Sequence, residues 1–255
     1  GAVDYKGYLY IFKRHGIFQV NYQPTRVNSS GTLFPWTEFP NPIVPGVGTQ
    51  SHRSIVKFTT PSTHATPGQE LVFFVDQYGT PRIFDGVTTI YFSSKIGTSR
   101  DTTIKCLADM DKTRNPYSFA INNPNKNLIY CFMSDLNSQQ NVCWMLDYSV
   151  GFAWGRDKYA LAFNCGAIFE NSSGEFLPYV GNYAGKVYKL ESGSDDDGEP
   201  IDDYAVFSDD YLKSPSINSK WFLTDIRGST GDTDQNAKIS YFLDGDETIS
   251  KTNEV

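Results

Sequence analysis

The chain has 255 residues, 39% of them hydrophobic, and a formal net charge of −7 at pH 7. A chain of this length and apolar content buries a sizeable core, which argues against disorder throughout. The acidic balance, with no basic cluster denser than Lys13 and Arg14, argues against sequence-specific nucleic-acid binding. No apolar run reaches the roughly 18 residues of a membrane span and no signal-peptide order is seen, so we expect a soluble protein.

Four segments each predict a β-hairpin, because two apolar or aromatic runs flank a turn in each. They are residues 8–20, turning at His15 and Gly16; residues 71–86, turning at 77–80; residues 128–148, with a polar connection at 134–141; and residues 175–190, turning at 182–185. Measured between Tyr10, Phe73, Tyr130 and Tyr179, the spacings are 63, 57 and 49 residues. This is near the period of roughly 40 to 50 residues of a four-stranded propeller blade.

Shorter strand candidates lie beside these hairpins, at residues 54–58, 88–92, 117–121 and 163–169. Between them we expect a long Pro-rich connection without regular elements at residues 21–50 and a polar surface loop at residues 59–69. One helical turn is expected at residues 107–112 and an aromatic-rich turn at residues 151–154. Each hairpin with its extra strand makes the three to four antiparallel strands that a blade needs.

The first hairpin carries apolar side chains on both faces, with Tyr10 and Phe12 on one side and Leu9 and Ile11 on the other. A strand that is apolar on both faces must be covered twice, which stacking of blades achieves. We therefore predict an all-β protein, an antiparallel β-propeller or a fragment of one.

The composition changes after residue 190, which suggests three parts. Residues 1–190 are the repeated, propeller-like domain, and residues 191–203 are an acidic loop. Residues 204–255 are a C-terminal β segment, interpreted as a small appendage or a partial last blade, with strands expected at residues 205–208, 220–227 and 237–243.

The order of these units resembles the β-propeller structural proteins of tailed bacteriophages, of the tail nozzle, hub or head-to-tail connection type. The resemblance rests on YLYIFKRHGIFQV, LVFFVDQYGTPRIFDG, the order NLIYCF then NVCWMLDYSVGFAWG, and YVGNYAGKVYKLESGSDDDGEPI. It covers roughly residues 8–243. It implies a structural virion protein whose copies and neighbouring tail proteins form a ring through which DNA passes, located in the tail and assembled in the host bacterial cytoplasm.

Catalytic chemistry has little support in the sequence. Motifs of serine hydrolases, nucleotide-binding loops and Rossmann folds do not occur. Asp76, Asp85, Asp147 and Glu175 lie near the hairpins, as the paired carboxylates of a propeller glycoside hydrolase would, but Asp76 and Asp85 flank turns and are better explained as caps of backbone amides. We predict no enzyme, no catalytic, cofactor or metal site, and no cofactor.

Other side chains leave alternatives open. His15, His52 and His64 lack zinc-site spacing, and a solvated acidic loop explains residues 195–197 better than calcium binding does. Trp36, Trp154 and Trp221 are candidates for a sugar-binding surface, which keeps a glycan- or receptor-binding module as the second hypothesis, whereas Trp144 is expected in the core. The four cysteines are expected to be reduced core residues, with a Cys131–Cys143 disulfide left open.

Overall fold

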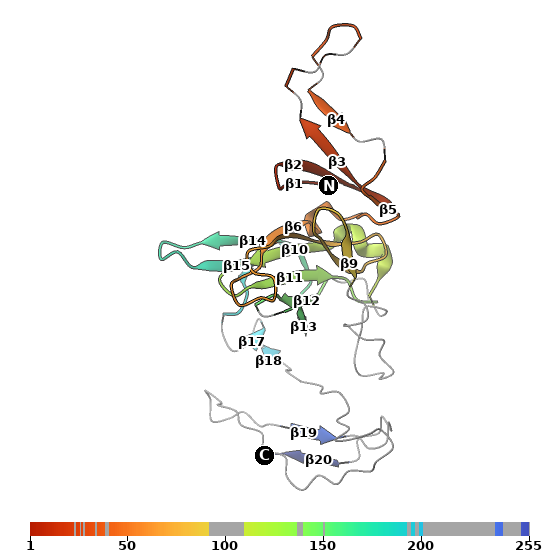
Figure 1. Cartoon of the computed structure of the whole chain (residues 1–255). Coiled ribbons are helices and arrows are strands. Elements are labelled where there is room, and N and C mark those ends of the chain that lie inside the picture. The colour runs from red at the N-terminus through yellow and green to blue at the C-terminus, as the bar shows by residue number, and fades with distance from the viewer. Residues whose placement is uncertain are drawn as a thin grey trace, which may run out of the picture. The chain divides into compact units, whose positions relative to one another are not determined.

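The computed structural model describes residues 1–22, 24–25, 27, 29–33, 35–38, 41–91, 110–136, 140–149, 151–192, 195–196, 199–200, 238–241 and 251–254. They are almost all antiparallel β-structure, so the all-β prediction is confirmed (Figure 1). The chain divides into two compact units, Gly1–Pro200 and Ile201–Val255.

The first sheet is built on the hairpin of β2 (Tyr8–Lys13) and β3 (Gly16–Tyr22). Strand β1 (Ala2–Tyr5) pairs with β2, and β4 (Trp36–Glu38) and β5 (Val44–Pro45) both pair with β3. The connection at residues 21–50 therefore does contain regular elements, contrary to the prediction. Its prolines are compatible with β5 because Pro45 stands at the end of a two-residue edge strand.

The second and third sheets are four-stranded meanders that follow one another along the chain. The second contains β6 (Val56–Thr59), β7 (Glu70–Val75), β8 (Pro81–Phe84) and β9 (Thr89–Tyr91) in that spatial order. The third contains β10 (Phe119–Asn123), β11 (Leu128–Met133), β12 (Val142–Asp147) and β13 (Ala153–Lys158). Short 3-10 helices, η1 (His52–Ser54) and η3 (Lys112–Tyr117), lead into them.

The fourth sheet has three strands, β14 (Phe163–Glu170), β15 (Phe176–Asn182) and β16 (Val187–Lys189). Beyond it, β17 (Asp195–Asp196) pairs with β18 (Glu199–Pro200) inside the stretch that was expected to be an acidic loop. In the second unit, β19 (Lys238–Tyr241) pairs with β20 (Lys251–Glu254), which confirms a strand within the predicted range 237–243. The strands expected at 205–208 and 220–227 lie outside the described residues.

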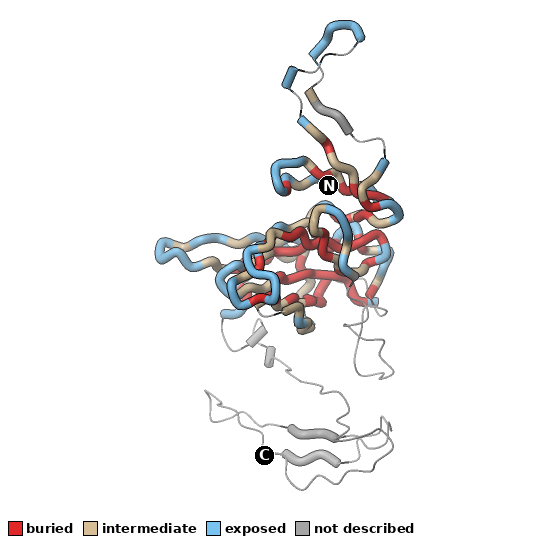
Figure 2. Tube along the Cα trace, in the orientation of Figure 1, coloured by how far each residue is buried: buried red, intermediate tan, exposed pale blue. Residues whose placement is uncertain are grey.

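The four sheets stack face to face in chain order, and strand alternation explains how. In β7, Phe73 and its alternate neighbours pack on the third sheet, whereas Val72 and Phe74 pack on the first. In β11, Cys131 and its alternate neighbours face the second sheet, whereas Tyr130 and Phe132 face the fourth. Both middle sheets are therefore buried on both faces, as Figure 2 shows in red.

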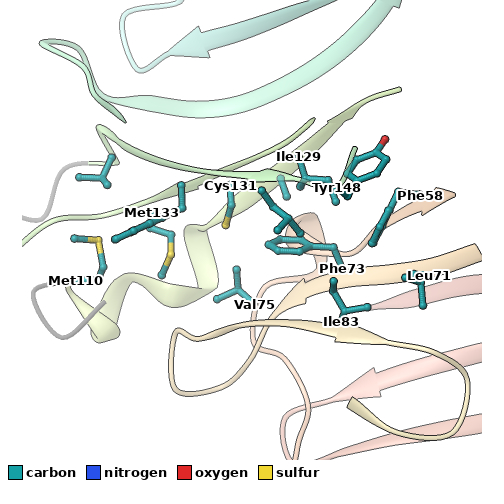
Figure 3. Close-up of a cluster of buried hydrophobic side chains, with 14 residues drawn as sticks. Phe58, Leu71, Phe73, Val75, Ile83, Met110, Ile129, Cys131, Met133 and Tyr148 are labelled. Atoms are coloured by element: carbon teal, nitrogen blue, oxygen red, sulfur yellow. The ribbon is translucent and has the colours of Figure 1, made fainter. Parts of the chain in front are cut away.

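Figure 3 shows the junction between the second and third sheets. Phe58 lies at a ring-centroid distance of 4.7 Å from Tyr148, and the other labelled side chains fill the layer between the two sheets. Stacks of this kind supply most of the folding free energy, at roughly 1.5–3 kcal/mol for each large apolar side chain that is fully buried.

The second, third and fourth sheets converge at their first strands. Cα atoms of β10 approach those of β6 and β14 to within 8 Å. Stacked sheets normally lie about 10 Å apart. The close approach at the first strands means that the sheets splay toward their last strands, so successive sheets turn about a line near β6, β10 and β14.

Several expected elements differ from those observed. Strand β1 was not predicted, and the aromatic-rich turn expected at residues 151–154 instead enters strand β13. Of the helical turn expected at 107–112, residues 107–109 lie outside the described residues and Met110 forms a β-bridge with Asp135. The helical residues begin only at Lys112, after Asp111 has capped the backbone amide of Thr113.

Candidate assembly surfaces

Polar side chains link neighbouring sheets by bonding to backbone carbonyls. The Tyr5 hydroxyl, from the first sheet, donates to the carbonyl oxygens of Glu70 at 2.6 Å and Asp85 at 2.9 Å in the second sheet. Such bonds hold the two sheets in one relative position, which apolar packing alone specifies less sharply.

Arg53, in η1, joins three of the sheets at the side where they converge. Its Nη1 donates to the carbonyl oxygen of Asn164 in β14 at 2.6 Å, and its Nη2 donates to that of Tyr117, just before β10, at 3.1 Å. Ser51, two residues earlier, donates to the carbonyl oxygen of Ser118. A planar guanidinium with donors on two sides suits such a three-way link, which a lysine would not reproduce.

The fourth sheet is attached to the third through Glu191. This carboxylate accepts from the Tyr130 hydroxyl and pairs with Lys126 at 2.5 Å. Burial, reinforced by the hydrogen bond to Glu191, raises the pKa of Tyr130. Glu191 has a φ of +56°, a left-handed conformation that costs free energy for a non-glycine residue, so its two contacts offset local strain.

The outer face of the fourth sheet carries mostly apolar side chains, with Lys189 beside Tyr179. Cross-strand pairing places Phe169 beside Leu177, Ala167 beside Tyr179, and Cys165 in the row of Val187 on this face. Phe169 is 59% exposed and Val187 is 70% exposed. The Phe169 and Tyr179 rings meet edge to face at 5.6 Å. Among the described residues, no element packs on this face.

The hairpin of β14 and β15 also extends beyond the strands of the third sheet (Figure 1). Its far part is coloured exposed or half-buried in Figure 2, in contrast to the red interior of the stack. The turn is held by Asn171, whose side-chain oxygen accepts from the backbone amides of Ser173 and Glu175, both at 2.9 Å. This well-ordered turn makes the hairpin a defined projecting arm.

The outer face of the first sheet also carries apolar side chains. Leu9, Ile11 and Phe18 point away from the second sheet and are half-buried, and they belong to none of the buried clusters found in the described part of the chain. Lys13 lies over the Phe18 ring at 4.2 Å. On the same face Val20, which pairs with Leu9, is 6% exposed and Asp4 lies on the other side of Leu9, so this end of the stack is partly covered and less uniformly apolar than its inner face.

The four carboxylates considered for glycoside hydrolysis each serve a separate turn. Asp76 is fully buried, accepts from the backbone amides of Tyr78 and Thr80 and pairs with Arg82 at 2.6 Å. Burial raises the pKa of Asp85, but hydrogen bonds from the amides of Thr88 and Val87 outweigh it and hold the pKa below its usual value.

Asp147 and Glu175 complete this set of four carboxylates. Asp147 accepts from the amide of Ser149, and Glu175 accepts from the Asn171 side chain. The capping role predicted for Asp76 and Asp85 is confirmed. The four carboxylates serve separate turns and do not form the carboxylate pair of a glycoside hydrolase.

The three histidines lie in separate parts of the fold. His15 lies exposed in the β2–β3 turn and His52 is exposed in η1. His64 is buried in the loop at residues 59–69, where its Nδ1 accepts from the Thr66 amide and its ring lies 4.9 Å from Phe152. Most residues of this loop are exposed, as predicted, and His64 anchors it against the residues between β12 and β13.

Tryptophan and cysteine side chains mostly belong to the interior. Trp144 is 5% exposed, as predicted for a core residue, and Trp154 packs against the same cluster, which counts against a sugar platform there. The side chain of Trp36, all of Trp221 and all of Cys106 lie outside the described residues.

Cys131 and Cys143 are free and buried, as expected, whereas Cys165 is free but exposed, contrary to the expectation. Cys131 pairs with Trp144, and Cys143 pairs with Phe132. The two sulfurs therefore lie on opposite faces of the sheet, which removes the disulfide alternative.

Metal-ligating clusters and membrane-spanning helices are absent from the described part of the chain. Within it, no group of three or more potential metal-ligating side chains occurs, and no helix has the length and hydropathy to cross a bilayer.

Comparisons with known proteins give no family assignment: no protein-family model matches the chain, and a search of curated proteins finds no significant match.

Proposed function

We propose that this chain is a structural subunit of a bacteriophage tail, of the nozzle or hub type, which builds a ring from copies of itself around the path of the DNA. The observation that carries the proposal is the stack of four antiparallel sheets that follow one another in chain order, of which the second, third and fourth converge at their first strands. Propeller blades have this kind of arrangement, and the sequence resembles that class of tail protein.

Two further observations favour a building role over chemistry. The polar side chains at the sheet junctions are used to fix one sheet to the next, as Arg53 and Tyr5 illustrate. An exposed face with several apolar side chains, among them Phe169 and Val187, lies at an end of the stack, where a neighbouring subunit would dock. A rigid unit with such an end face is suited to mechanical assembly.

Electron microscopy of the purified chain tests the proposal. We expect class averages of closed rings with rotational symmetry, and antibodies against the chain should label the tails of the phage particles that carry it. A protein that stays monomeric at about 50 μM, a concentration well above that needed for a micromolar interface, would contradict the proposal.

A further inference from the structure

We propose that the outer face of the fourth sheet docks on the outer face of the first sheet of a second copy, so that copies join head to tail. This inference rests on the proposed function and names the contact through which the ring forms. The face on the fourth sheet comprises Cys165, Ala167, Phe169, Leu177, Tyr179 and Val187, and that on the first comprises Leu9, Ile11 and Phe18.

The first argument is continuity with the interfaces inside the molecule. At each internal junction, an apolar sheet face is covered by the apolar face of the next sheet in the chain. The fourth-sheet face is left open by the described residues. The first-sheet face is partly open, since Leu9, Ile11 and Phe18 are half-buried and Val20, which pairs with Leu9, is 6% exposed. A first sheet placed on the fourth sheet of another copy repeats the internal arrangement without a new kind of contact.

The second argument is that only a head-to-tail contact covers both ends. Two copies that met through their fourth sheets would form a closed dimer and leave both first-sheet faces exposed. A heterologous contact instead uses one face of each type and continues from copy to copy. Because the sheets converge at β6, β10 and β14, the continued stack curves, which favours a ring over a straight filament.

The third argument is exposure. Phe169 and Val187 lie on one face and are 59% and 70% exposed, and apolar side chains gathered on an exposed face are typical of a protein–protein contact. The projecting arm of β14 and β15 lengthens the contact beyond the width of the stack.

A matched pair of valine variants tests the contact. Val187 and Val87 are 70% and 69% exposed, but only Val187 lies on the proposed face, since Val87 is in the β8–β9 turn. Burying a carboxylate in an apolar interface is costly, so Val187→Asp should weaken self-association at least about 100-fold in sedimentation velocity. Val87→Asp should assemble like the parent protein. Circular dichroism checks that both variants are folded.

Cross-linking through Cys165 identifies the partner face. In a Cys106→Ser background, Ile11→Cys with a short bismaleimide should give a ladder of covalent oligomers longer than dimers. Tyr78→Cys, at a position 61% exposed in the β7–β8 turn, is the control and should give none. Cys131 and Cys143 are buried and stay unlabelled.

The outcomes separate this inference from the proposed function. Rings that persist in Val187→Asp, together with no cross-link from Cys165 to the thiol of the Ile11→Cys variant, would overturn the inference and leave the tail-ring proposal intact on another surface. Dimers linked through Cys165 alone would also overturn it, because they require two fourth sheets to meet. A parent protein that never assembles would contradict both proposals.

Discussion

Single polar residues hold this stack together at places where the backbone turns or changes sheet. Asp76, whose own side chain is fully buried, accepts from two backbone amides and one guanidinium at the β7–β8 turn. Arg53 links neighbouring sheets in a similar way, because its guanidinium donates to two backbone carbonyls, one in β14 and one just before β10. Buried polar groups of this kind are costly when one partner is lost, so individual substitutions have measurable effects on stability.

Arg53→Ala should lower the free energy of unfolding by about 2 kcal/mol. The reason is that both carbonyls lose a charged donor, and hydrogen bonds to charged groups contribute roughly 1.5–3 kcal/mol. Urea unfolding measures the change. Arg14→Ala, at an exposed position of the β2–β3 turn, is the control and should stay within about 0.5 kcal/mol of the parent. Equal effects of both variants would show that Arg53 does not link the sheets.

Alkaline pH should destabilise the protein through Tyr148. Burial raises the pKa of Tyr148 to about 12, above the ordinary value of 10.0. Its contribution to stability is therefore complete below about pH 10 and is lost as the pH rises toward 12. Urea unfolding between pH 7 and about 11.5 should show a smaller loss of stability for Tyr148→Phe than for the parent.

The Tyr148→Phe variant also removes a hydrogen bond to Asn122. At neutral pH it should therefore be less stable by about 1 kcal/mol. Parallel pH profiles for the two proteins would count against this role of Tyr148.

At the scale of the element, strand β7 shows why the fold is a stack rather than a two-layer sandwich. In a sandwich, one face of each sheet meets solvent and alternate residues are polar. In β7, Leu71 to Val75 are all at most 2% exposed, because sheets cover both faces. β2 differs, since only its inner residues Tyr10 and Phe12 are fully covered.

Alanine substitutions on the two faces of β7 test this arrangement. Phe73→Ala and Phe74→Ala should each destabilise the protein by roughly 3–5 kcal/mol, because each leaves a cavity in a different sheet junction. Ile11→Ala, on the half-covered outer face of β2, should cost only about 1 kcal/mol in the monomer. Chemical denaturation at low protein concentration provides the values. A small effect for Phe74→Ala would mean that the first sheet does not pack there.

At the largest scale, the four sheets of the unit Gly1–Pro200 form a nearly one-dimensional series in which each packs on its neighbours. The terminal fourth sheet has three strands and one exposed apolar face, so less burial holds it in place than holds the middle sheets. Such terminal units open at lower free energy than interior units. The two buried cysteines of the third sheet allow this difference in stability to be measured, because Cys143 faces the fourth sheet and Cys131 faces the second.

Cys143 should react with a thiol reagent faster than Cys131 under native conditions. Only the fourth sheet covers Cys143, whereas Cys131 lies in the junction with the second sheet. Burial raises the pKa of both thiols, so neither reacts without opening. Peptide mass spectrometry of labelled protein gives the two rates, and denatured protein supplies the reference. Equal native rates would indicate that all four sheets open together.

Much of the strand content could be predicted locally. All four hairpins were located, because alternating or continuous apolar runs around turn residues are a local property. Strand β13 was missed because AWGRDK carries few apolar side chains and pairs only with β12. Strands β4 and β5 were missed because prolines surround them and their hydrogen bonds come from β3, distant in the sequence.

The sequence by itself determined that this protein is made of successive aromatic hairpins with two apolar faces. Tertiary structure alone decided which face meets which sheet, since register between strands sets the side on which each residue falls. Cys131 and Cys143 show this, because a one-residue offset in pairing separates them onto opposite faces. The same is true of the end faces: whether Leu9 or Phe169 is covered depends on where the stack stops, which no local pattern encodes.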